Sequence, residues 1–153
     1  MRRLLTLLPA ALLLATTLCS VAATGRVAKV LPHFLDLKGR HALSPSLYER
    51  DAYQAQLRQH PEQRSGLRFD ILTRVRTRNA VNLRLKVEMR GIAQGNLPSE
   101  KILEKEVKAG GGSRWTAITL GSDDYKILGE ITAWRVSLWE GDQLIGEQKS
   151  FLW

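Results

Sequence analysis

Alternation of apolar and charged side chains dominates the second half of the chain. Residues 67–77 and 82–90 carry apolar or threonine side chains at odd positions and mostly charged ones at even positions. A period of two is typical of a strand with one face on a core and the other in water. Weaker forms of this pattern occupy residues 27–31, 102–107, 115–120, 131–139 and 144–153. About seven short strands are a number typical of an antiparallel β-sandwich.

One helix is predicted near residues 46–60. Ser46 and Glu49 have the spacing of a capping box, and Pro61 ends the helical pattern. The predicted apolar face of this helix consists of Tyr48, Ala52 and Ala55, with Tyr53 and Leu57 beside it. The fold class we expect is therefore mainly β: an antiparallel β-sandwich with an N-terminal extension and one short amphipathic helix.

The two strongest strand segments are joined by a short connection. Arg78-Asn79-Ala80 is a plausible turn between residues 67–77 and 82–90. This connection allows the two segments to pair as neighbours in one sheet. Their even-numbered side chains would then share one outer face.

Residues from 115 onward show a strand, an Asp-Asp-Tyr turn at 123–125, a strand centred on Trp134 and a closing hairpin. This order resembles the last strands of bacterial immunoglobulin-like and fibronectin-III-like β-sandwich domains. The resemblance covers about a third of the chain and implies architecture alone. The cysteine pair of such domains is absent, and Tyr125 lies in the turn instead of on the following strand.

Residues 1–23 have the order of parts of a secretory signal peptide. Two arginines precede an uncharged apolar run over residues 4–18, and small side chains occupy residues 20–23. We expect cleavage near Ala23, which leaves residues 24–153 as one domain, periplasmic or secreted. The apolar run is shorter than the ~20 residues of a spanning helix, so we expect no transmembrane anchor in the mature chain.

Two other interpretations of this leader stay open. One is a retained membrane anchor. The other is lipidation of Cys19, although the preceding Thr16-Thr17-Leu18 departs from the lipoprotein motif in its bulky leucine.

Removal of the leader leaves 21 basic and 15 acidic residues, a net charge of +6, and no cysteine. The missing cysteine excludes disulfides, a cysteine-based zinc site and a cysteine nucleophile in the mature chain. Nucleic acid is the usual partner of a basic domain, but an exported protein rarely meets it. We therefore expect an envelope polymer or a protein as partner, and no nucleic acid.

Basic side chains at the even positions of the two strongest strands are the first candidate site. Arginine binds phosphate and carboxylate groups through paired hydrogen bonds. The predicted anion-binding residues are Arg68, Arg74, Arg76, Arg78, Arg84, Lys86 and Arg90. An ordinary solvated sheet face, or a face covered by the acidic residues of the helix, is the alternative.

Trp139 is the second candidate, as an apolar anchor for a partner. Its parity is opposite to that of Trp134, Val136 and Leu138, and it lies at the mouth of the last hairpin. A tryptophan in this position is able to stack on a sugar or to contact a protein.

Catalytic chemistry has little support in the sequence. The three histidines lack metal-ligand spacing, and no nucleophile, base and orienting group come together in a motif. We expect no enzymatic activity, no cofactor and no metal. The hydrolase alternative would gather His33, Asp36 and His41 in a pocket.

The function expected from the sequence is a non-catalytic binding or adaptor module of the cell envelope. A second alternative is a small outer-membrane β-barrel protein, since the terminal Phe151-Leu152-Trp153 is similar to an outer-membrane assembly signal.

Overall fold

The computed structural model describes residues 23–77 and 81–153. The predicted leader up to residue 22, with Cys19, and the connection at residues 78–80 lie outside the described residues. The strands are β1 (Thr24–Asp36), β2 (Arg64–Arg76), β3 (Val81–Ala93), β4 (Leu97–Ala109), β5 (Gly112–Leu120), β6 (Glu130–Glu140) and β7 (Gln143–Lys149). The helices are α1 (Leu47–Gln59) and α2 (Ser122–Leu128), with 3-10 turns at Pro61–Gln63 and Gln94–Asn96.

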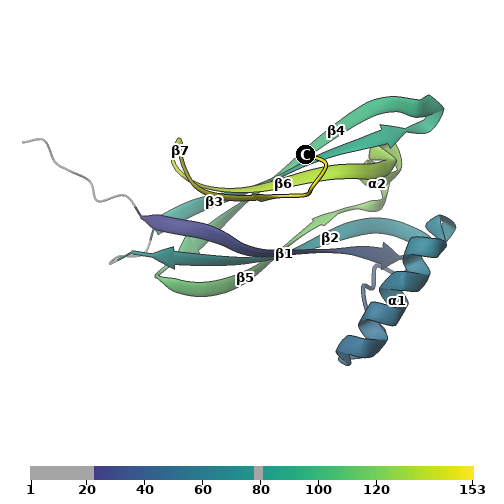
Figure 1. Cartoon of the computed structure of the whole chain (residues 1–153), viewed down its shortest axis with the longest axis horizontal. Helices are drawn as coiled ribbons and strands as arrows, with labels where there is room; N and C mark the ends of the chain where they lie inside the picture. The colour runs from purple at the N-terminus through teal and green to yellow at the C-terminus, as the bar shows by residue number, and fades with distance from the viewer. Residues whose placement is uncertain (1–22, 78–80) are drawn as a thin grey trace, which may run out of the picture.

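The seven strands of the described residues form two antiparallel sheets that face each other (Figure 1). One sheet has the order β1-β2-β5, and the other has the order β4-β3-β6-β7. The predicted fold class is confirmed: the protein is mainly β, an antiparallel sandwich with a helix near residues 46–60. The turn at residues 123–125 is longer than expected, because it belongs to the second helix, α2.

The predicted pairing of residues 67–77 with residues 82–90 is wrong. β2 pairs with β1 and β5, whereas β3 pairs with β4 and β6. The two consecutive strands lie in different sheets, and their apolar faces meet across the core. Alternation along a strand identifies its buried face, but it carries no information about which strand lies beside it.

Inward-facing side chains of both sheets build one core. Those with no exposed surface include Phe69 and Ile71 of β2, Leu85 of β3 and Val136 of β6. Trp134 packs against this core with its ring edge-on to Phe69, at a centroid distance of 6.1 Å. Trp134 therefore lies on the core side of β6, partly buried.

β1 is longer than the short strand expected at residues 27–31. Its register on β2 shifts between Val27 and Lys29, as a bulge does, so Arg26 and Lys29 both face outward. The bulge breaks the parity of the segment and hides the strand from a search for strict alternation.

Helix α1 has the predicted start, but its buried side is shifted from the predicted face, and of the residues predicted there only Leu57 is buried. The Ser46 hydroxyl accepts a hydrogen bond from the backbone N–H of Glu49 at 3.4 Å. Tyr48 is 84% exposed, and the buried side of the helix contains Gln54 and Leu57. The Gln54 amide accepts from the N–H of Phe34 and donates to the backbone carbonyls of Phe34 and His41, a polar attachment that a search for apolar side chains overlooks.

The residue that precedes β1 packs with the core. Ala23 is buried with the core residues, and its backbone N–H donates to Glu140 Oε2 at 2.7 Å. Edge strands β1 and β7 approach closely there, since a Cβ atom on Gly146 would lie 2.7 Å from the Cα of Arg26. In the part of the chain that the structure describes, no helix has the length and apolar character to cross a membrane.

Candidate anion-binding site

The predicted basic residues are divided between two separate outer faces. Arg68, Arg74 and Arg76 lie on β2, in the three-stranded sheet, whereas Arg84, Lys86 and Arg90 lie on β3, in the four-stranded sheet. Arg78 lies outside the described residues. The single face expected from the sequence is thus not formed, because β2 and β3 do not pair.

Acidic residues of β4 face the basic residues of β3. The cross-strand neighbours are Arg84 with Glu106, Lys86 with Glu104 and Arg90 with Glu100. An ion pair joins Arg90 Nε to Glu100 Oε1 at 3.5 Å, and another joins Lys86 Nζ to Glu88 Oε1 at 3.3 Å. Opposite charges at facing positions stabilise a strand pair. Each basic residue of this face of β3 thus has a glutamate opposite it, and among the described residues Arg90 alone forms an ion pair with that glutamate, while Arg84 Nε is buried without a hydrogen-bond partner.

Trp139 lies on the same four-stranded sheet, opposite Arg84. Its ring is half-buried, and its indole N–H donates to Ser137 Oγ at 2.8 Å. The polar atom of the predicted anchor therefore already has a partner within the sheet.

The three-stranded sheet has a different arrangement. Arg26 on β1 lies directly opposite Arg74 on β2, and Arg74 lies opposite Ser113 on β5. Two residues farther along β2, Arg76 lies opposite Thr24 of β1. Because neighbouring strands present cross-strand partners on the same face, Arg26, Arg74 and Ser113 form one row across the sheet.

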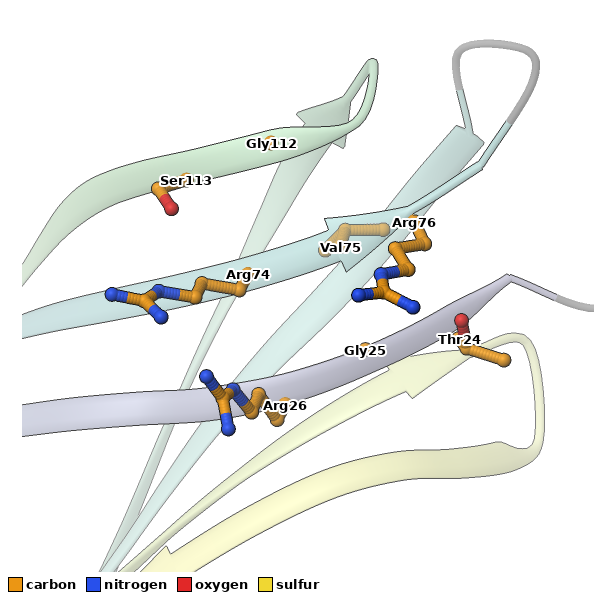
Figure 2. Close-up of a pocket in the computed structure, with 8 residues that line it drawn as sticks. All are labelled: Thr24, Gly25, Arg26, Arg74, Val75, Arg76, Gly112 and Ser113. Carbon is orange, nitrogen blue, oxygen red and sulfur yellow. The ribbon is translucent and has the colours of Figure 1, made fainter.

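The three arginines line an open hollow of about 520 Å³ at the end of the sheet. Figure 2 shows the guanidinium of Arg76 reaching from β2 toward β1, and that of Arg26 rising from β1 toward β2. All three side chains are exposed. We refer to Arg26, Arg74 and Arg76 as the arginine cluster.

The arginine cluster has no counter-charge among the described residues. Within residues 23–77 and 81–153, none of its guanidinium groups forms an ion pair or a hydrogen bond. The nearest carboxylate along β2 is Asp70, which is already engaged by Arg68 at 2.8 Å and by His33 at 3.2 Å. Helix α1, with its acidic residues, packs at the other end of β1 (Figure 1).

Arg68 belongs to a second group at that opposite end. The His33 ring shares Asp70 with Arg68 and lies 5.5 Å from the ring of His41, centroid to centroid. Burial lowers the pKa of His33, although Asp70 acts in the other direction. Burial, with the nearby charge of Arg68, also lowers the pKa of His41.

Asp36 does not join His33, contrary to the pairing considered for a hydrolase. Its carboxylate accepts from the Tyr53 hydroxyl at 2.7 Å and from the Arg40 side chain and the Lys38 backbone N–H, each at 2.8 Å. This carboxylate therefore holds the loop after β1 against the helix. In the described residues, no three His, Cys, Asp or Glu side chains come together as ligands for a metal ion.

Sequence reasoning missed Arg26, Ser113 and the exposed Trp115, which lies beside them on β5. Arg26 precedes the bulge in a segment without strict alternation. Ser113 and Trp115 start a strand after three glycines, and nothing in their local sequence indicates that β5 lies next to β2.

Comparison with protein-family models, with curated proteins and with solved structures gives no match to this chain. The arginine cluster must therefore be interpreted from its own geometry.

Proposed function

We propose that this protein is a non-catalytic binding module that holds anionic groups on the arginine cluster. The observation that carries the proposal is the direct opposition of Arg26 and Arg74, with Arg76 beside them and no carboxylate of the described residues paired with any of the three. An anion with several oxygens fits such a cluster, because each guanidinium offers a planar fork of donors to phosphate or carboxylate.

The charge distribution of the two sheets supports this choice of face. On β3 each of the three basic residues lies opposite a glutamate of β4, and Arg90 forms an ion pair with Glu100, whereas on β2 Arg74 lies opposite another arginine. Like charges at facing positions destabilise a strand pair. A bound anion would relieve this repulsion, so the cluster is better suited to a ligand than to the stability of the free protein.

The setting that we propose is the cell envelope. The leader-like segment at residues 1–23 supports export, and exported proteins meet polymers that carry phosphate or carboxylate groups. The division of seven antiparallel strands between two packed sheets supports the immunoglobulin-like architecture, a scaffold that presents binding surfaces in many proteins.

The test is calorimetric titration of the purified protein with inorganic polyphosphate at low and high salt. The Arg74→Gln variant should bind at least fivefold more weakly than the wild type and with a flatter dependence on salt. Arg58→Gln, which removes the same charge from an exposed position of α1, is the matched control and should bind like the wild type. Equal affinities of the two variants would overturn the proposal.

A further inference from the structure

An exposed aromatic ring adjoins the arginine cluster on the same face. Trp115 is 52% exposed, more than any of the other three tryptophans, which are partly buried. It lies on β5 opposite Leu72 of β2, and Leu72 lies opposite Lys29 of β1. Lys29, Leu72 and Trp115 therefore form a second row across the sheet, next to the row of Arg26, Arg74 and Ser113.

The two rows are close enough to contact one ligand. They are separated by two residues along β2 and β5, which corresponds to roughly 7 Å in an extended strand. Arg74 and Trp115 are diagonal neighbours across the strand pair, a relationship that long and aromatic side chains span. A ligand on this face thus meets a flat apolar surface and a positive charge side by side.

The strand that carries Trp115 also offers hydrogen-bonding groups. β5 is an edge strand of its sheet, so part of its backbone N–H and C=O groups faces away from β2. Ser113 adds an exposed hydroxyl beside Arg74. Donors and acceptors along an edge suit a ligand that is rich in hydroxyl groups.

We infer that the ligand of the arginine cluster is an acidic saccharide, which stacks a sugar ring on Trp115 while its carboxylate or phosphate groups pair with Arg26 and Arg74. This inference rests on the proposed function, because it uses the same cluster for the charged part of the ligand. A sugar presents an apolar ring face, polar edges and hydroxyl groups, and the aromatic ring, the cations and the strand edge match these three parts.

The experiment compares ligands that carry negative charge without a ring with ligands that carry negative charge on sugar rings or on stacking bases. Inorganic polyphosphate carries charge without sugar rings. An oligogalacturonate and a phosphomannan carry carboxylate and phosphate on sugar rings, and a single-stranded oligonucleotide carries phosphate with stacking bases. Each is titrated into the wild type, Trp115→Ala, Trp115→Phe, Arg74→Gln and, as the matched control on the other sheet, Trp139→Phe. Circular dichroism verifies that each variant is folded.

Trp115→Ala should weaken binding of at least one acidic saccharide at least fivefold and leave polyphosphate binding unchanged. Trp115→Phe should restore most of the affinity, and Trp139→Phe should bind like the wild type. Arg74→Gln should weaken binding of every anion. The saccharide that depends on Trp115 identifies carboxylate or phosphate as the charged group.

Three results would contradict the inference. The first is a Trp115→Ala variant with every affinity unchanged, and the second is one in which polyphosphate binding weakens as strongly as saccharide binding. The third is an oligonucleotide that binds the wild type more tightly than both saccharides. In each of these cases a loss of affinity in Arg74→Gln would leave the anion site itself intact. An Arg74→Gln variant that binds all four ligands like the wild type would instead overturn the proposed function.

Discussion

Arg26 on β1 and Arg74 on β2 face each other directly in an antiparallel strand pair. Neither guanidinium has an ion-pair partner in the part of the chain that the structure describes. Like charges at facing positions of a strand pair destabilise the folded protein, here by about 0.5 kcal/mol. The free protein therefore retains a local electrostatic repulsion at its outer surface.

The first prediction concerns the stability of the free protein. Arg74→Gln should raise the free energy of unfolding at low ionic strength, by about 0.2–1 kcal/mol, because it removes the repulsion from Arg26. Urea unfolding in a buffer without multivalent anions measures this change. Arg58→Gln should leave the value unchanged, and the difference between the variants should shrink in high salt. A clear loss of stability in Arg74→Gln would show that its guanidinium stabilises the fold.

The second prediction concerns the carboxylate of Asp36. Burial alone would raise the pKa of Asp36, but hydrogen bonds from Arg40, Tyr53 and the Lys38 backbone lower it to about 2. The folded state keeps this group charged below its ordinary pKa of 3.8. Its contribution to the free energy of unfolding is therefore complete above that pH. It is lost as the pH falls from about 4 through 2.

Asp36→Asn should consequently destabilise the protein at neutral pH by about 1–3 kcal/mol and flatten the loss of stability between pH 4 and 2. Urea unfolding at a series of pH values measures both effects. If the variant lost stability between pH 4 and 2 as steeply as the wild type, the role given to Asp36 would be contradicted.

The third prediction concerns mildly acidic pH. Burial lowers the pKa of His33 and of His41 below the ordinary histidine value of 6.5, so the unfolded chain takes up protons before the folded protein does. The contribution of the two neutral histidines to the free energy of unfolding should be complete above pH 6.5 and should decrease as the pH falls below it. His33→Gln should reduce this slope. An unchanged slope in His33→Gln would contradict the assignment.

The fourth prediction concerns the contact between β1 and β7. Gly146→Ala should destabilise the protein by about 1–3 kcal/mol, because the new methyl group has no room beside Arg26. It should also weaken anion binding, since the strand that carries Arg26 must shift. Gly110→Ala, where a Cβ atom meets nothing within 4 Å, is the control and should unfold at the wild-type urea concentration. Equal stability of the two variants would contradict the packing described for the sandwich edge.

The fifth prediction concerns the start of the mature chain. Ala23 is buried, and its backbone N–H donates a hydrogen bond to the Glu140 carboxylate. Cleavage after Ala23 would remove both contacts, whereas cleavage after Ala22 keeps them and places Ser20 and Ala22 at the positions that need small side chains. Mass spectrometry of the protein exported by a bacterial host should therefore find Ala23 as the first residue. A chain that begins at Thr24 would contradict this expectation.

The buried faces of the strands were predictable from the sequence. Leu83, Leu85, Val87 and Met89 are each at most 2% exposed, as their strict alternation predicts. A strand places successive side chains on opposite faces whatever its partners are, so this information is local.

The pairing of strands was not predictable, because it depends on residues far apart in the chain. Arg74 and Arg84 have the same pattern around them, yet one faces Arg26 and the other faces Glu106. The bulge in β1 concealed Arg26, and the weak alternation of residues 102–107 gave no reason to place acidic side chains beside β3. The two faces therefore differ in charge for a reason that no single strand reveals.

Nuclear magnetic resonance of the labelled protein, with the arginine Nε–Hε signals followed during a phosphate titration, tests the location of the site most directly. The structure predicts that the signals of Arg26, Arg74 and Arg76 shift together with one common affinity, and that those of Arg84 and Arg90 stay in place. Largest shifts on Arg84 or Arg90, or an unmoved Arg74 signal, would contradict anion binding by the arginine cluster.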